Sequence, residues 1–280
     1  MSIESKISEQ HEIENKEILL PEEIKHPTPL IMQEIDRIGG KGIIAYGEGW
    51  HNASGTLAYE VELVAELSKR GYKIERIFLE EQEDMQGKVR EFYETGKMPE
   101  ELIHYLEEGF VRQDAARKYQ YKIALLESCK TLNIPVQFID RNDAPDRDAD
   151  WYNKIIRHIG YKPRGLYLLI AGNTHVSHSS KISRDIPVVA KLDRKYPNAV
   201  RSVLVETDGY IRDSNQVEAS KCFLDDLEAL GQSDELCAIK IERSPYQDVA
   251  LARTGMRRDV KAAEAFDILV MVPGENLEKP

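Results

Sequence analysis

Short apolar runs alternate with longer amphipathic stretches along most of this chain, and that alternation constrains the fold more than any other feature of the sequence. From Gly42 onward the apolar runs are rich in Ile, Val, Leu and Phe. Such a pattern is typical of βα units on a largely parallel sheet. The predicted strands are Gly42–Tyr46, Ile74–Leu79, Ile134–Ile139, Gly165–Ala171, Val200–Val205, Leu236–Ile241 and Phe266–Val272. We therefore expect an α/β fold with a largely parallel central sheet flanked by helices.

The stretches between the strands predict helices and one insertion. Ser54–Arg70 carries apolar residues at near-helical spacing, with Ser54 placed as the N-cap and Gly71 as the stop. The segment Asp84–Thr131, between the second and third strands, is expected to be a helical insertion. Residues 1–29 are polar and acid-rich and predict an N-terminal arm, so that residues 30–280 make one domain. The other predicted helices are Pro99–Glu108, Asp114–Leu132, Trp151–Ile159 and Pro187–Tyr196.

Composition argues against several classes of protein. The formal net charge of −11 disfavours general affinity for nucleic-acid phosphates or anionic membrane surfaces, because clustered Lys and Arg drive such binding. No apolar run approaches the ~18–20 residues that span a bilayer. Three scattered cysteines predict reduced thiols, and the N-terminus lacks the pattern of a signal peptide. We expect no nucleic-acid partner and no membrane span, with residence in the cytoplasm or secretion by a route that needs no signal peptide.

Polar residues at the ends of the predicted strands are the candidates for a functional site, because open parallel sheets bind ligands at the carboxyl ends of their strands. After the first strand, Glu48 and His51 lie three residues apart in a glycine-bracketed turn. A carboxylate beside an imidazole fixes its tautomer and raises its basicity, which suits a general base or a metal ligand. The alternative is a helix-entry loop whose polar residues only cap the helix. A dinucleotide site is disfavoured, because Asn52 stands where the third glycine belongs.

The second and third strands also end in polar residues. Glu80 is the first polar residue after the second apolar run, so it is favoured over its neighbour Glu81. The alternative is a solvated acidic loop, since such loops are common at strand exits. The third strand ends in Asp140 and Arg141, which are either a site pair or a plain surface ion pair.

The fourth strand leaves through Gly172 into Asn173 and His175. A histidine in this position can stabilise a developing oxyanion, protonate a leaving group or bind a metal. A structural histidine is the alternative. His178, in the serine-rich loop that follows, is expected to be exposed and incidental.

Taken together, three short motifs resemble one superfamily. Strand-Gly-Glu-x-x-His, then a strand ending in Glu, then strand-Ala-Gly-Asn-x-His-Val is similar to the superfamily that joins erythromycin-esterase-like proteins, ChaN-type haem-binding lipoproteins and Tiki-type metalloproteases. Gly47–His51 resembles the esterase branch, and the run from Ala171 looks more like the ChaN branch. The resemblance covers about Gly42 to Val205. It implies an α/β domain with a pocket at the carboxyl rim of the sheet.

The resemblance also implies roles for the matching residues. The leading hypothesis is a hydrolase that acts on ester or amide bonds of a small-molecule or peptide substrate. His51, oriented by Glu48, would activate water, Glu80 would position that water, and His175 would stabilise the oxyanion or protonate the leaving group. The expected substrate-binding residues are Glu81, Asp140, Arg141 and Asn173.

Two alternatives come from other classes of protein. Some bacterial toxins and secreted effectors carry a domain of this type, so the chain could act by binding a host protein. It could also carry a ligand without turnover. A divalent metal is expected before haem, because the Asp that follows the histidine in the ChaN branch and a lipoprotein signal are both absent. The metal ligands would then be His51, His175, Glu48 and Glu80.

Overall fold

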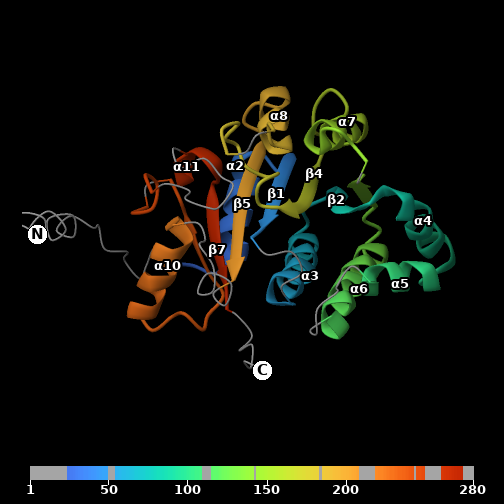
Figure 1. Cartoon of the computed structure of the whole chain (residues 1–280), viewed down its shortest axis with the longest axis horizontal. Helices are drawn as coiled ribbons and strands as arrows, with labels where there is room; N and C mark the ends of the chain where they lie inside the picture. The colour runs from blue at the N-terminus through green and yellow to red at the C-terminus, as the bar shows by residue number, and fades with distance from the viewer. Residues whose placement is uncertain are drawn as a thin grey trace, which may run out of the picture.

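The computed structural model describes residues 24–49, 54–108, 115–141, 143–182, 185–207, 218–242, 244–249 and 260–273. Its centre is a seven-stranded sheet in the order β3-β2-β4-β1-β5-β7-β6 (Figure 1). The strands are β1 (Gly42–Glu48), β2 (Ile74–Gln82), β3 (Val136–Asp140), β4 (Leu166–Gly172), β5 (Val200–Thr207), β6 (Cys237–Lys240) and β7 (Ile268–Val272). Every strand pair is parallel except the one between β6 and β7. The predicted α/β class and largely parallel sheet are confirmed.

Five strands run further than their apolar residues predict. β1 extends to Glu48, β2 to Gln82, β3 to Asp140, β4 to Gly172 and β5 to Thr207. In each case the neighbouring strand continues to pair with the backbone, as Glu48 does with Gly172 of β4 and with Val205 of β5. The polar side chains at these ends are therefore held by regular strand geometry rather than by loops.

Helices cover both faces of the sheet. They are α2 (Pro27–Arg37), α3 (Ser54–Lys69), α4 (Gln86–Thr95), α5 (Glu100–Glu108), α6 (Ala115–Thr131), α7 (Arg147–Ile159), α8 (Val188–Lys195), α10 (Glu218–Ala229) and α11 (Ala262–Ala265), with a 3-10 turn, η2 (Glu83–Met85). The insertion between β2 and β3 consists of η2, α4, α5 and α6, as predicted. The helices α2, α4, α10 and α11 were not among those predicted individually.

Side chains alternate between the two faces of the sheet along each strand, and each face carries its own buried core. In β1, Ile43 and Ala45 face a core shared with α7, α8 and α10, whereas Ile44 and Tyr46 face a core shared with α2, α3 and the insertion. All four side chains are at most 1% exposed. Because both faces of the central strands are covered, their sequences read as continuous apolar runs rather than as alternating ones.

The end of the predicted N-terminal arm belongs to the folded part of the chain. Lys25 exchanges backbone hydrogen bonds of 3.0 and 2.7 Å with Ala238 of β6, and α2 begins at Pro27. Residues 1–23 lie outside the described part. Among the described helices, none combines the length and the apolar character needed to cross a bilayer.

Candidate active site

Five acidic residues lie at the carboxyl ends of the parallel strands. They are Glu48 of β1, Glu80 and Glu81 of β2, Asp140 of β3 and Glu206 of β5. Parallel strands deliver such residues to one edge of the sheet. The sequence predicted this edge as the site and four of these residues, but it missed Glu206. His51, the expected general base, lies outside the described residues.

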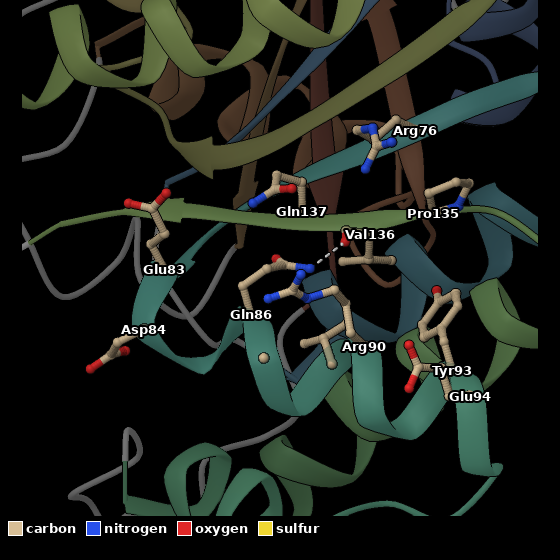
Figure 2. A pocket seen from close by; sticks show the side chains of 12 residues that line it. Arg76, Glu83, Asp84, Gln86, Arg90, Tyr93, Glu94, Pro135, Val136 and Gln137 are labelled. Atoms are coloured by element: carbon tan, nitrogen blue, oxygen red, sulfur yellow. Dashed lines mark hydrogen bonds between the residues drawn. The ribbon is translucent and has the colours of Figure 1, made fainter.

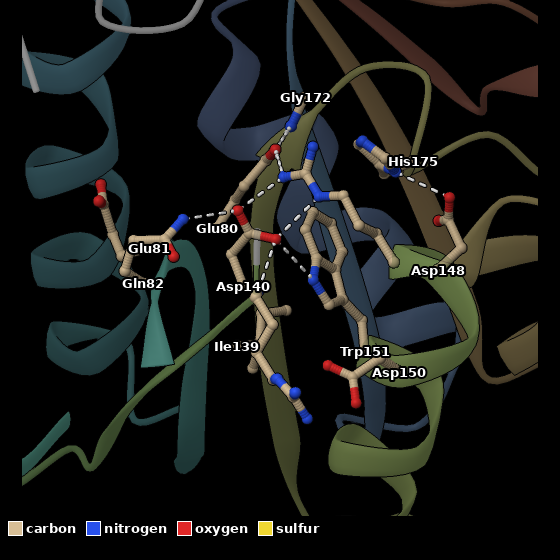
Figure 3. A network of polar contacts seen from close by, with 12 residues as sticks. Glu80, Glu81, Gln82, Ile139, Asp140, Asp148, Asp150, Trp151, Gly172 and His175 are labelled. Atoms are coloured by element: carbon tan, nitrogen blue, oxygen red, sulfur yellow. Dashed lines mark hydrogen bonds and ion pairs between the residues drawn. The ribbon is translucent and has the colours of Figure 1, made fainter. Parts of the chain in front are cut away.

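Glu80 belongs to a network on the α7 side of the sheet (Figure 3). Arg147 of α7 donates to Glu80 Oε1 and to Asp140 Oδ2, both at 2.8 Å. The backbone amide of Gly172 donates to Glu80 Oε2 at 2.6 Å, and Trp151 Nε1 donates to Asp140 Oδ1 at 3.2 Å. Charge-assisted bonds of this kind fix both carboxylates in position.

His175 lies beside this network and is oriented by a carboxylate of its own. Its Nδ1 lies 2.9 Å from Asp148 Oδ2, and Asp148 Oδ1 accepts a 2.7 Å bond from the amide of Val188. The ring packs against Trp151 with centroids 4.6 Å apart and the ring planes tilted by 47°. Burial alone would lower the pKa of His175, but the hydrogen bond and charge of Asp148 outweigh it and raise the pKa above its ordinary value. The His175 side chain is 18% exposed, so the ring still reaches solvent.

A second cluster of charged groups lies on the opposite face, between β1, β2, α3 and α6. Glu48 and Glu60 are 3% and 1% exposed. Lys122 Nζ lies 3.8 Å from Glu60 Oε2 and 3.8 Å from Glu81 Oε1, and Tyr105 donates to Glu81 Oε2 at 2.9 Å. Burial, opposed by Lys122 and reinforced by Glu48, raises the pKa of Glu60. The insertion thus supplies the cation that balances these carboxylates.

Strand alternation explains why the two neighbouring glutamates have different partners. Successive side chains of a strand point to opposite faces. Glu80 therefore meets Arg147 of α7, whereas Glu81 meets Tyr105 of α5 and Lys122 of α6. Both residues are engaged, so neither is a solvated acidic loop residue.

The glycines of the β1 turn are required by space rather than by unusual backbone angles. Neither Gly47 nor Gly49 has a positive φ. A Cβ on Gly49 would lie 1.9 Å from Glu206 Oε2, and one on Gly47 would lie 2.2 Å from Val176 Cγ2. Glycine at position 49 lets the backbone approach the buried carboxylate of Glu206, which is 0% exposed.

The remaining predicted residues fall in different surroundings. Asn173 is buried, and its backbone amide donates to the Glu48 carbonyl at 3.0 Å. Arg141 instead forms an exposed pair with Asp143, with its Nη2 3.0 Å from Asp143 Oδ2. Arg147, six residues later, is the arginine that joins Glu80 and Asp140.

His178 is not exposed and incidental, as the sequence suggested. Its Nδ1 lies 2.6 Å from Asp193 Oδ2 and its Nε2 lies 2.9 Å from Asp267 Oδ2. Only 18% of its side chain is exposed. The histidine links α8 to the start of β7, a long-range contact that its serine-rich surroundings did not reveal.

Several residues that sequence reasoning missed carry a recognisable signal. Arg147 and Asp148 occupy the first turn of α7, directly after a strand end, where helices approach the carboxyl rim. Lys122 lies on the stripe of α6 that also carries the buried Leu125 and Leu126. A charge on an apolar helix stripe indicates a buried ion pair.

The described residues contain no group of three or more His, Cys, Asp or Glu side chains arranged to hold a metal ion. Three of the four expected ligands, Glu48, Glu80 and His175, are described, and Glu80 and Glu48 point to opposite faces of the sheet. His51 lies outside the described residues, so metal binding remains a prediction.

No known family model matches the sequence, and no curated protein is similar to it. Solved structures do match the fold. A mutant of the erythromycin esterase EreC in its open conformation aligns with a TM-score of 0.54 and 12% identity, over 89% of this chain and 95% of the other. A protein from Bacillus cereus aligns with a TM-score of 0.53 and 13% identity, over 88% of this chain and 92% of the other.

Two further alignments extend the comparison. A succinoglycan biosynthesis protein has a TM-score of 0.52 and 12% identity, over 87% of this chain and 90% of its own. The type III effector HopBA1 aligns over 73% of this chain and 92% of its own at 18% identity, but its TM-score of 0.46 is too low to bear on function. At these identities the likeness concerns the fold alone. The predicted resemblance is confirmed at that level: the chain has the fold of the erythromycin esterase EreC.

Proposed function

We propose that this chain is a hydrolase of ester or amide bonds whose site lies at the carboxyl rim of the sheet. The observation that carries the proposal is the Asp148–His175 pair beside Glu80. A histidine whose Nδ1 is held by a buried carboxylate is oriented for acid–base work at its other ring nitrogen. The shared fold with an esterase supports the same reaction class.

The raised pKa of His175 suits it to act as the acid. In its protonated form it would donate Nε2–H to the developing oxyanion or to the leaving group. Asp148 stays available to stabilise the imidazolium, since the Val188 amide holds its second oxygen. Trp151 packs against the ring in a tilted arrangement and limits its rotation.

The carboxylates of the rim would position and help to activate the attacking water. Glu80 is held in position by Arg147 and Gly172 and would accept a hydrogen bond from that water. Glu48 would orient His51 as the base, as the sequence predicts.

The test is turnover of a panel of short-chain 4-nitrophenyl esters and aminoacyl anilides by the full chain. We expect His51→Ala and Glu48→Gln to lower kcat/KM by about 10²–10⁴, the usual contribution of a general base. His104→Ala is the matched control, because that histidine is 70% exposed on α5 and, among the described residues, forms an ion pair with Glu108 alone. Folded His51→Ala and Glu48→Gln proteins with unchanged turnover would contradict the proposal.

A further inference from the structure

A groove of about 590 Å³ lies between α4 and the edge strand β3 (Figure 2). Arg76 of β2, Arg90 and Tyr93 of α4, and Gln137 of β3 contribute to its lining. None of the acidic residues of the candidate active site lines it. Its volume is within the range of about 300–1,000 Å³ that small-molecule sites occupy.

Arg76 differs from the other half-buried arginines of the described chain. Arg147 pairs with Glu80 and Asp140, and Arg201 Nε lies 2.9 Å from Glu34 Oε2. For Arg76, no hydrogen bond or ion pair to another described residue is present. Burial lowers the pKa of Arg76, and the neighbouring Tyr167 and Tyr93 oppose that effect. A partly desolvated guanidinium without an acceptor is costly, so an anion in the groove would relieve it.

We propose that this groove binds a small ligand through an anionic group, a phosphate or a carboxylate, held by Arg76. The planar guanidinium offers a fork of N–H donors that matches two oxygens of either anion. Arg90 also lines the groove, but it is exposed, so water and salt screen its charge as they screen other exposed charges, and Arg76 is the main cation. Val89 and Val136 provide an apolar wall for the body of the ligand.

The acidic side chains of the groove do not cancel this charge. Glu83 Oε2 lies 2.7 Å from Lys154 Nζ, which also pairs with Asp150 at 2.6 Å, so Lys154 balances part of the charge of Glu83. Asp84 and Glu94 are exposed, where water and salt screen them, whereas Arg76 is half-buried. The anion is thus expected at the Arg76 side of the groove.

The edge of β3 favours a compact ligand over an extended peptide strand. The Gln86 side chain donates to the Val136 carbonyl at 3.1 Å and accepts from the Phe138 amide at 2.7 Å. These are the outward backbone groups that an added strand would need. An anionic group could still come from a free small molecule or from a phosphorylated side chain, and the two share the same chemistry at Arg76.

The experiment is an NMR titration of the full chain with phenylphosphonate, inorganic phosphate and a phosphoserine tetrapeptide, following backbone amides and arginine Nε–Hε signals. We expect saturable shifts at Arg76 and around α4, with phenylphosphonate binding at least tenfold more tightly than phosphate because of its apolar ring. Arg76→Met should lower the affinity for phenylphosphonate at least tenfold. Arg70→Met is the matched control, because Arg70 is exposed at the end of α3 and does not line the groove.

Each outcome decides between the proposal and its alternatives. Absence of saturable binding, or equal affinity for phenylphosphonate in the Arg76→Met protein, would overturn the proposal. Any anion near Arg76 would then be an adventitious ion only. Tighter binding of the tetrapeptide than of phenylphosphonate would assign the anion to a protein partner. If Arg76→Met fails to fold, Arg76→Lys and Arg90→Met replace it, and each should lower the affinity for phenylphosphonate severalfold. Unchanged affinity in both of these variants would also overturn the proposal.

Discussion

At the scale of single residues, two histidines of one loop have different roles because of their carboxylate partners. His175 has one aspartate and a second ring nitrogen without a described partner, so its proton can be passed on. His178 is held at both ring nitrogens by Asp193 and Asp267. The first arrangement suits catalysis and the second suits stability. Sequence alone could not separate the two, since Asp148, Asp193 and Asp267 come from distant segments.

His178 predicts a pH dependence of stability. Burial opposes its charge, but the hydrogen bonds to Asp193 and Asp267 raise its pKa to about 9. A raised folded-state pKa contributes stability that is complete below about pH 6.5 and is lost as the pH rises through 9. We expect urea unfolding to show a loss of roughly 3 kcal/mol across that window. His178→Gln should flatten this dependence, and an unchanged profile in that variant would refute the assignment.

Asp148 predicts a pH dependence of activity. Because Asp148 raises the pKa of His175, the protonated ring persists to higher pH than in an isolated histidine. Activity that needs this acid should fall as the pH rises through the raised pKa. Asp148→Asn should move that fall to lower pH and reduce kcat, as measured by the pH profile of kcat/KM on an ester of the panel. An identical profile in Asp148→Asn would show that the aspartate has no such role.

At the scale of elements, the insertion completes both the sheet edge and the charged rim. Helix α4 covers the edge strand β3 through the side chain of Gln86, and α6 delivers Lys122 to Glu60 and Glu81. Unpaired strand edges are templates for aggregation, so covering β3 protects the fold. The sequence predicted a helical insertion at this place, but it gave no means to orient the helices, because their contacts join residues far apart in the chain.

Gln86 tests the protection of the edge. Gln86→Ala removes one donor and one acceptor from the backbone of β3 and should cost about 1–2 kcal/mol of unfolding free energy, together with faster aggregation on heating. Glu91→Ala is the control on the same helix, because Glu91 is half exposed and its side chain forms a surface ion pair with Lys88. Equal stability of the two variants would argue against a role of Gln86 at the edge.

Lys122 tests the charge balance of the rim. Lys122→Met leaves Glu60 and Glu81 buried without their cation and should cost about 3–5 kcal/mol. Adding Glu60→Gln should recover part of that loss, because one buried carboxylate is then neutral. Lys69→Met, at a lysine that is 75% exposed, should change stability by less than about 0.5 kcal/mol. If the double variant Lys122→Met/Glu60→Gln is no more stable than Lys122→Met, then Lys122 does not stabilise the protein by balancing the charge of Glu60.

At the scale of the whole molecule, the sequence predicts the sheet better than it predicts the site. All seven strands follow from apolar runs, since burial on both faces leaves a clear pattern. The carboxyl rim follows from parallel topology. The residues that contact the rim cannot be predicted in this way. Arg147, Lys122 and Glu206 each come close to their partners at the rim only when the chain folds. Arg141 illustrates the limit: it follows Asp140 in the sequence but pairs with Asp143, and Arg147 is the arginine that contacts Asp140, so a role of Arg141 in substrate binding stays a prediction.

The most direct test of the central claim is hydrolysis in H₂¹⁸O of the best ester or anilide of the panel, with the full chain and the His175→Ala protein side by side. The account predicts one ¹⁸O atom in the carboxylate product and a rate about 10²–10⁴ lower in His175→Ala. His175→Ala should keep the far-ultraviolet circular dichroism spectrum of the folded protein. A folded His175→Ala protein with the wild-type rate would show that the rim is not the site of reaction.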